Sequence, residues 1–229
     1  YLTYSIITIL QYSHKHLYNY LMNKIDNKLN QIYRCHDILD ESVLNVIKKV
    51  NRELFVPKDF KNFANTDYVI PLGKDQNMLT PFSEAKILQE MSFNKNDNVL
   101  LIGMGSGYLT ECISYLCKTV TTYEVNEDLY EFGKNNLDLY SNNRKKIHIE
   151  HKNILTDLVK IQDYTKVVFT CSLKSYQTFV RYMREKSKIF FFINQENSPY
   201  TEGIIIEKTR NGYTEKKNIV TSKTNQLMD

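Results

Sequence analysis

One stretch of the chain, residues 98–124, narrows the possible folds more than any other. It reads NVLLIGMGSGYLTECISYLCKTVTTYE: an apolar run, a turn with three glycines at alternate positions, a helical pattern and a second run ending at Glu124. A short apolar run that is followed by glycine and a helix is typical of a buried strand in a β-α-β unit. A glycine turn at a helix N-terminus lets an adenosine-containing cofactor approach the backbone. This stretch therefore predicts a cofactor-binding unit.

The glycine spacing distinguishes two classes of cofactor. Dinucleotide sites use G-x-G-x-x-G, whereas this turn reads G-x-G-x-G through Gly103, Gly105 and Gly107. Tyr108 stands where the dinucleotide pattern has its last glycine. The compact form suits a ligand without a pyrophosphate, such as S-adenosylmethionine, and Glu124 is placed to accept hydrogen bonds from ribose hydroxyls. A purely structural turn and a solvated strand end stay open as alternatives.

Composition limits the class of protein. The 229 residues, 42% hydrophobic and 24% charged, allow one substantial core of an ordinary globular protein. The net charge is only +4 and no long Lys/Arg block alternates with aromatic side chains, so we expect no nucleic-acid partner. The four cysteines form no C-x-x-C pair and the five histidines are scattered. We therefore expect free thiols in a reducing cytoplasm and no metal site.

The order of the expected elements predicts an α/β fold. Asp40 and Thr80-Pro81 are typical helix N-termini, and irregular backbone is expected over residues 67–76. Strands then alternate with helices, which implies a mostly parallel sheet covered on both faces. A hairpin turn, Asn211-Gly212, joins the last two strands. Strands are expected at 99–102, up to 124, and at 145–150, 166–171, 188–194, 203–210 and 213–221, and helices after the glycine turn and at 127–139 and 175–185.

Three segments together resemble one enzyme family. VLLIGMGSGYLTECISYL, NRELFVPKDF and DYVIPLGKDQNMLTPFSEAKILQEM resemble the protein-L-isoaspartate O-methyltransferase family, with the closest likeness to its bacterial branch. The resemblance implies a Rossmann-like class I methyltransferase, with a mostly parallel seven-stranded sheet, helices on both faces and a C-terminal antiparallel hairpin. It also implies methyl transfer from S-adenosylmethionine to the α-carboxylate of L-isoaspartyl residues in damaged proteins, as a step of protein repair. By resemblance we expect a cytoplasmic monomer.

The extent of the resemblance suggests a division of the chain. It begins near Met22, so both Tyr1 and Met22 stay open as the native start. We expect residues 1–21 to be an extension outside the core and 22–229 to form one domain. Within it, residues 22–80 would supply N-terminal helices and a substrate-side loop, and 81–229 the cofactor-binding sheet. The apolar run within residues 1–21 is about ten residues, too short for a bilayer, so we expect no membrane association.

The resemblance also assigns roles to matching residues. Thr80 and Asp67 are candidates for catalysis, although Thr80 is equally well explained as a helix N-cap. Isoaspartyl-containing proteins or peptides would be the substrate. The expected cofactor-binding residues are Gly103, Gly105, Ser106, Gly107, Tyr108, Glu124 and Asn153, and the expected substrate loop contains Ile70, Pro71, Gly73 and Gln76.

Five places depart from the family pattern. Leu79 stands where the main branch has Ser, Leu101 where it has an acid, Asn153 where it has the adenine-side Asp, Thr165 where it has Asp, and Lys186-Ser187 where it has Gly-Gly. Methylation of a carboxylate needs alignment and exclusion of water more than a base, because carboxylates are ionised at neutral pH. Three functions stay open. We favour an isoaspartyl methyltransferase over a weakened or inactive binding module and over a methyltransferase with another substrate.

Overall fold

The computed structural model describes residues 31–194, 198–222, 224 and 226–227. The chain divides into two compact units, residues 1–39 and 40–229. In the first unit, residues 31–35 are helical and the chain turns at Asp37, whose φ is 58°. The extension expected over residues 1–21 and the boundary at Met22 lie outside the described residues. The division expected near residue 80 stays a prediction.

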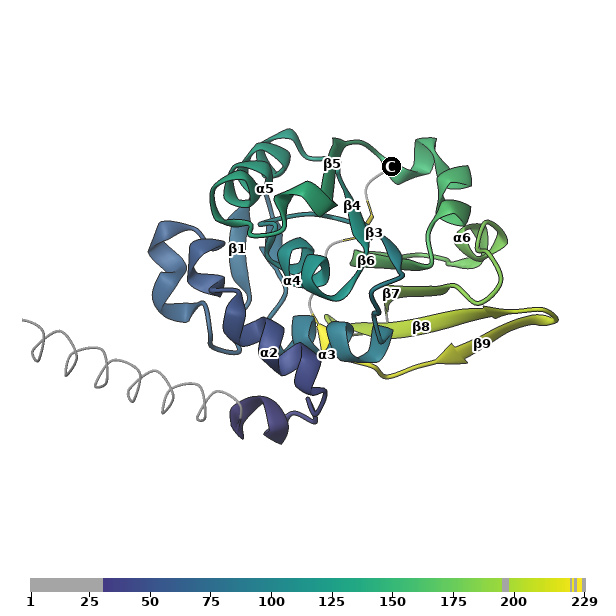
Figure 1. The fold of residues 1–229 in the computed structure, drawn as a ribbon, viewed down its shortest axis with the longest axis horizontal. Helices are drawn as coiled ribbons and strands as arrows, with labels where there is room; N and C mark the ends of the chain where they lie inside the picture. The colour runs from purple at the N-terminus through teal and green to yellow at the C-terminus, as the bar shows by residue number, and fades with distance from the viewer. Residues whose placement is uncertain (1–30, 195–197, 223, 225, 228–229) are drawn as a thin grey trace, which may run out of the picture. The chain divides into compact units, whose positions relative to one another are not determined.

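A central sheet organises the second unit (Figure 1). Its order is β10-β8-β7-β6-β3-β4-β5, and β9 is an additional strand that pairs with β8. The pairs among β3 to β7 are parallel, whereas β8 pairs antiparallel with β7, β9 and β10. The expected mostly parallel sheet with a C-terminal antiparallel hairpin is therefore confirmed, whereas the described residues form eight strands in this sheet instead of the expected seven. The strands are β3 Asn98–Ile102, β4 Thr119–Glu124, β5 Ile147–His151, β6 Lys166–Leu173, β7 Lys188–Asn194, β8 Thr201–Thr209, β9 Gly212–Lys216 and β10 Thr221–Ser222.

The strand order reverses next to β3. This strand pairs with β4 on one side and with β6 on the other, so the connections leave it in opposite directions. In open α/β sheets, ligands bind in the crevice that this reversal opens at the carboxyl ends of the strands. The glycine turn follows β3 directly and therefore lies at the crevice.

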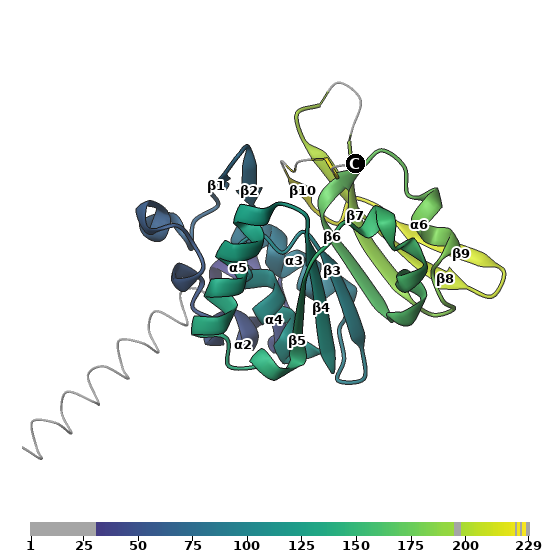
Figure 2. The same ribbon diagram turned by 90° about the horizontal axis from the view of Figure 1, so that it is seen from above.

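Helices cover both faces of the sheet. Figure 2 shows α4 and α5 on one face and α6 on the other. Leu100 and Ile102 of β3 belong to the cluster on the α6 side, together with Phe169, Phe179 and other apolar side chains. The alternate residues of β3 point to the opposite face and are also fully buried. Burial on both faces explains why the sequence of β3 is a continuous apolar run.

The helix N-termini expected at Asp40 and Thr80 are confirmed, whereas the helix expected over residues 175–185 is shorter. The Asp40 side chain accepts a hydrogen bond from Ser42 N at 2.8 Å, and Thr80 Oγ1 accepts one from Ser83 N at 3.3 Å. The helix expected over residues 175–185 begins without a side-chain cap and is only five residues long. Helix α2 ends at Lys49, because Val50 is extended. The helices are α2 Glu41–Lys49, α3 Pro81–Met91, α4 Tyr108–Leu116, α5 Glu127–Tyr140 and α6 Gln177–Arg181, with 3₁₀ turns η1 Arg52–Leu54, η2 Lys58–Phe63, η3 Arg144–Lys146, η4 Ile154–Thr156 and η5 Leu158–Asp163.

The irregular backbone expected over residues 67–76 is wrong for most of that segment. Strands β1 (Ile70–Gly73) and β2 (Gln76–Met78) form an antiparallel hairpin. Lys74 and Asp75 make its turn with φ values of 49° and 59°. Two consecutive left-handed residues are what a tight hairpin turn requires. Pro71 is tolerated because it lies at an irregularity of a two-stranded pair.

A buried ion pair connects η1 to α3. Arg52 Nε lies 2.9 Å from Glu84 Oε2, and the two side chains are 1% and 5% exposed. The guanidinium also donates to the backbone carbonyls of Ala64 and Leu79 and lies 5.2 Å from the centre of the Tyr108 ring. Burial raises the pKa of Glu84 to about 7, against the lowering effect of Arg52. One side chain thus fixes four separate segments beside the crevice.

We predict that Glu84 makes the stability of the fold depend on pH. The pKa of Glu84 is about 7 in the folded protein, whereas an ordinary glutamate has 4.5, the value we take for the unfolded chain. The folded state therefore holds this proton more tightly. The resulting stabilisation is complete below pH 4.5 and is lost as the pH rises through 7. Between pH 5 and 8 the wild type should lose on the order of 1–3 kcal/mol of unfolding free energy relative to Glu84→Gln. Urea unfolding at several pH values measures this difference.

The matched control is Glu131→Gln, because Glu131 is an exposed residue of α5. This variant should keep the pH profile of the wild type. Parallel profiles for the wild type and Glu84→Gln would contradict the prediction.

Candidate functional site

The turn after β3 requires glycine for both conformation and space. Gly103, Gly105 and Gly107 have φ values of 89°, 53° and 86°, in the region that glycine alone adopts readily. A Cβ on Gly103 would lie 2.3 Å from Thr170 Oγ1, and one on Gly107 would lie 2.9 Å from Leu137 Cγ. A Cβ on Gly105 would meet only Leu72 Cδ1, at 3.4 Å. Other parts of the protein therefore fill the space next to Gly103 and Gly107, whereas the turn is open at Gly105, towards Leu72.

Glu124 is fixed beside this turn. Its Oε2 accepts a hydrogen bond from Gly105 N at 2.9 Å, and its Oε1 accepts from Val125 N at 3.0 Å and Asn126 N at 3.1 Å. The residue is 6% exposed, so it is not the solvated strand end considered above. A carboxylate has about four lone-pair positions, and three amides leave one for a ligand hydroxyl.

Helix α5 supports the turn from the other side. A Cβ on Gly133 would lie 2.4 Å from Gly105 O, so the helix touches the turn backbone directly. The buried Asn136 side chain donates from Nδ2 to Ser106 O at 3.0 Å. Neither Gly133 nor Asn136 was predicted from the sequence. A glycine inside a helical pattern indicates a close approach and could have identified Gly133.

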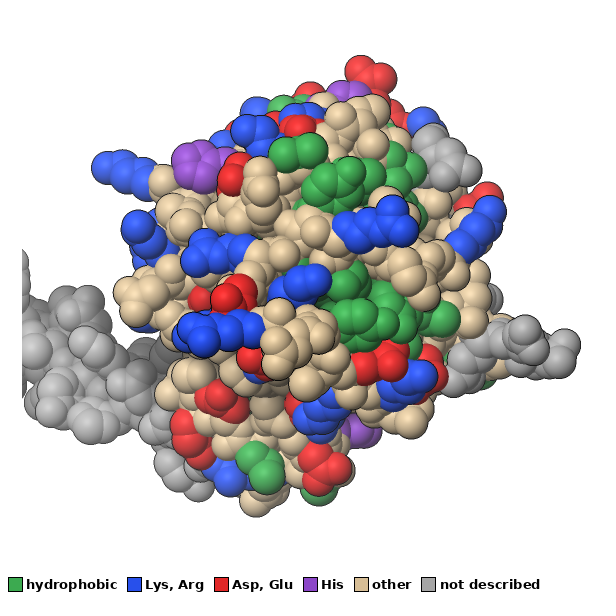
Figure 3. Space-filling view, turned by 90° about the vertical axis from the view of Figure 1, so that its right-hand side faces the viewer, with side chains coloured by type: hydrophobic (Ala, Val, Ile, Leu, Met, Phe, Trp, Pro, Cys, Tyr) green, Lys and Arg blue, Asp and Glu red, His purple; other side chains and the backbone are tan. Residues whose placement is uncertain are grey.

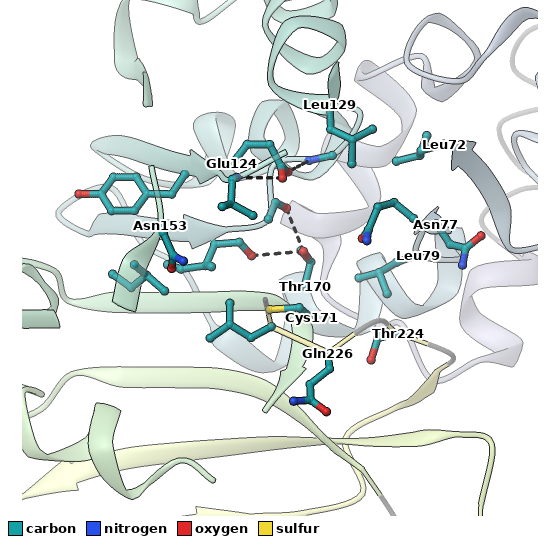
Figure 4. A pocket seen from close by; sticks show the side chains of 18 of the residues that line it. Leu72, Asn77, Leu79, Glu124, Leu129, Asn153, Thr170, Cys171, Thr224 and Gln226 are labelled. Carbon is teal, nitrogen blue, oxygen red and sulfur yellow. Dashed lines mark hydrogen bonds between the residues drawn. The ribbon is translucent and has the colours of Figure 1, made fainter. Parts of the chain in front are cut away.

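An open cleft lies in front of the turn (Figure 4). Its empty space, counted out to open solvent, is about 730 Å³. The walls come from the β1–β2 hairpin, the ends of β3, β4 and β6, the segment after β5 and the C-terminal tail. They are formed by Leu72, Gln76, Asn77, Leu79, Ile102, Gly103, Gly105, Tyr123, Glu124, Val125, Leu129, Lys152, Asn153, Ile154, Thr170, Cys171, Thr224, Gln226 and Leu227.

The structure brings some of the expected site residues together and separates others. Five of them line the cleft: Gln76, Gly103, Gly105, Glu124 and Asn153. The others lie outside its lining. Ser106 and Tyr108 are buried, Gly107 caps α4, Thr80 is buried at its helix cap, Asp67 is exposed, and Ile70, Pro71 and Gly73 belong to strand β1. The functional roles assigned to all these residues stay predictions.

Most departures from the family pattern lie away from the cleft. Leu101 is fully buried and does not line it. Thr165 Oγ1 donates to Asp97 Oδ1 at 2.7 Å, and Ser187 Oγ donates to Arg184 O at 2.7 Å, in the loops before β6 and β7. Leu79 and Asn153 reach the cleft. Two of the five departures can therefore contact a ligand directly.

Several lining residues were missed by the sequence analysis. Thr170 and Cys171 lie near the carboxyl end of β6, where the rule for open sheets could have found them. Thr224 and Gln226 come from the tail, which is held where Leu227 N donates to Ser172 O at 2.8 Å. No local pattern predicts that contact. Burial raises the pKa of Cys171 to about 12, so its thiol stays protonated at neutral pH.

Within the described part of the chain, no group of three or more His, Cys, Asp or Glu side chains is placed to hold a metal ion. No described helix has the length and apolar character needed to cross a membrane.

Comparison with known proteins relates the whole arrangement to one family. The family model for protein-L-isoaspartate(D-aspartate) O-methyltransferase matches residues 23–221. The protein-L-isoaspartate O-methyltransferase of Petrotoga mobilis is 42% identical over 101 residues, 44% of this chain and 47% of that protein. The one from Myxococcus xanthus is 34% identical over 99 residues, 43% of this chain and 47% of that protein. The chain thus spans about half the length of the curated relatives it matches.

A solved structure supports the fold. A Plasmodium falciparum protein described as a protein-L-isoaspartate O-methyltransferase, in complex with S-adenosyl-L-homocysteine, superposes with a TM-score of 0.75 at 18% identity. The match covers 88% of this chain and 97% of that one. The agreement in fold thus extends beyond the 101 residues that align with the Petrotoga mobilis relative.

The close approach of α5 to the glycine turn predicts an unusual result for Gly133→Ala. Helix propensity alone would stabilise the protein by up to about 1 kcal/mol. Because the new methyl group would meet Gly105 O, we expect instead a loss of about 1–3 kcal/mol of unfolding free energy. Thermal or urea unfolding measures it. Asn135→Ala, at the exposed neighbouring position of α5, should be neutral or stabilising, and equal behaviour of the two variants would contradict the packing argument.

Proposed function

The chain belongs to the protein-L-isoaspartate(D-aspartate) O-methyltransferase family, and on this premise we propose that it is an S-adenosylmethionine-dependent methyltransferase. Its proposed substrate is the α-carboxylate of L-isoaspartyl residues in damaged polypeptides. One observation carries the proposal: a buried carboxylate, Glu124, held by three backbone amides beside an open glycine turn at the reversal of strand order. This is the arrangement that binds a nucleoside in α/β proteins.

The residues present fit the proposed cofactor. Gly105 leaves its backbone open towards the cleft, and Glu124 keeps an acceptor position for a ribose hydroxyl. Tyr123, Ile154 and Asn153 would hold the adenine, since they offer apolar surface and one carboxamide at that end. When bound, S-adenosylmethionine supplies an electrophilic methyl group on a sulfonium sulfur.

The chain's own contribution would be alignment and exclusion of water. The acceptor carboxylate is ionised at neutral pH, so no side chain has to remove a proton from it. Leu72, Leu79 and Leu129 give the cleft apolar walls that keep water from the reacting groups. The carboxamides of Gln76 and Gln226 can donate hydrogen bonds to a carboxylate or to a peptide backbone. Alignment of this kind supplies much of the rate in bimolecular transfers.

The two catalytic candidates have different surroundings. Thr80 Oγ1 accepts from Ser83 N and lies 3.1 Å from Ser83 Oγ, which supports its role as a helix cap. Asp67 is exposed and outside the cleft lining. Because Leu79 offers no hydroxyl, we infer that carboxamides orient the substrate where other members use Ser. The monomeric state, the cytoplasmic location and the absence of a nucleic-acid partner stay predictions.

The activity is tested with two peptides that differ only in an isoaspartyl or an aspartyl linkage. With labelled S-adenosylmethionine, the protein should form base-labile methyl esters on the isoaspartyl peptide alone. Calorimetry should show S-adenosylhomocysteine binding, which Glu124→Gln weakens at least about tenfold because it removes a charge-assisted hydrogen bond. Glu131→Gln is the control and should bind normally.

The alternatives give different results in the same experiments. Absence of cofactor binding at millimolar concentration would reject the enzyme and support a binding module. Cofactor binding without any methylation of the isoaspartyl peptide would indicate another substrate.

A further inference from the structure

Thr170 has an unusual position in the cleft. It lies near the carboxyl end of β6, is half-buried and lines the cleft next to Gly103, the first residue of the glycine turn (Figure 4). Its Oγ1 donates to Gly103 O at 2.9 Å, with Ile102 O at 3.2 Å. The hydroxyl thus contacts the turn backbone at Gly103, and it would clash with a Cβ at that position.

The Thr170 hydroxyl keeps its acceptor capacity. A hydroxyl has one hydrogen and two lone pairs, and here the hydrogen is used by the carbonyls of the turn. Among the described residues, no hydrogen-bond donor reaches Thr170 Oγ1. Gly103 O has a second lone pair beside it. Two neutral acceptors therefore lie together on the cleft wall.

The cleft has little negative charge to offer a cationic group. Among the described lining residues, Glu124 has the one carboxylate, and three backbone amides already donate to it. Leu101, two residues before the first glycine, is buried away from the cleft and uncharged. A cofactor with an α-ammonium group therefore needs other acceptors, because a buried ammonium without hydrogen bonds is strongly unfavourable.

The order of residues across the cleft places Thr170 next to the amino-acid end of such a cofactor. In the view of Figure 4, Asn153, Thr170 and Leu79 follow one another across the opening. With the ribose at Glu124 and the adenine towards Asn153, the amino-acid part of the cofactor extends towards Gly103 and Thr170. This step rests on the proposed function.

We propose that Thr170 is a specificity-determining residue: its hydroxyl oxygen, together with Gly103 O, accepts the α-ammonium group of the cofactor in place of a carboxylate. Recognition of the amino-acid end of the cofactor would then depend on the dipoles of a hydroxyl and a carbonyl group, not on a charged side chain. The hydroxyl has two tasks, since its hydrogen orients the Gly103 carbonyl and its oxygen receives the ligand.

Two ligands and three variants test this proposal. S-adenosylhomocysteine has the α-ammonium group, whereas 5′-methylthioadenosine has the same nucleoside without the amino-acid part. Calorimetry on Thr170→Val should show a loss of about tenfold in affinity for S-adenosylhomocysteine and less than a twofold change for 5′-methylthioadenosine. Thr170→Ser should bind both ligands as the wild type does. Thr122→Val, at a buried threonine of β4 whose hydroxyl has no partner among the described residues, is the matched control and should change neither affinity.

The other outcomes are decisive as well. Equal losses for both ligands in Thr170→Val would mean that Thr170 only shapes the turn, and would overturn the proposal. Unchanged binding of S-adenosylhomocysteine would also overturn it while leaving the proposed function intact. A wild-type protein that binds neither ligand would reject the proposed function and this proposal together. If Thr170→Val does not fold, Thr170→Ala gives the same comparison.

Discussion

The site depends on one crowded piece of backbone, the glycine turn between β3 and α4. Thr170 touches it from β6, Gly133 and Leu137 of α5 press against it, and the remaining open side faces the cleft. Each of these contacts excludes a methyl group, so the turn has no room to relax when a side chain is added. The path of this backbone is set before any ligand arrives, which reduces the ordering that binding requires.

The Arg52–Glu84 pair performs a similar task on the opposite wall. Through the carbonyl of Leu79 it holds the segment that leads from the β1–β2 hairpin into α3, and through the carbonyl of Ala64 it holds the chain just after η2. A buried pair of this kind contributes little net stability but is strongly destabilising when one partner is removed. The effect of the pair here is to fix the position of Leu79, which forms part of the cleft wall.

The sequence predicts the parts of this structure that follow from local chemistry. Periodicity and glycine spacing identify the parallel strands, the helix caps at Asp40 and Thr80, and Glu124 beside the turn. It does not predict what depends on contacts distant in the chain. Thr224 and Gln226 reach the cleft only because the tail pairs at Ser172, and the β1–β2 hairpin was missed because its turn uses Lys74 and Asp75 where Asn-Gly is usual.

The turn of that hairpin has a consequence for how the cleft opens. Lys74 and Asp75 both adopt left-handed backbone, which is unfavourable for residues with a Cβ, and Lys74 reaches Asp128 of α5 only through an exposed ion pair. The turn next to the wall formed by Leu72, Gln76 and Asn77 is thus held by weak contacts. The amide hydrogens of this hairpin should exchange with solvent through local fluctuations far smaller than global unfolding, so this wall can move while the glycine turn stays fixed.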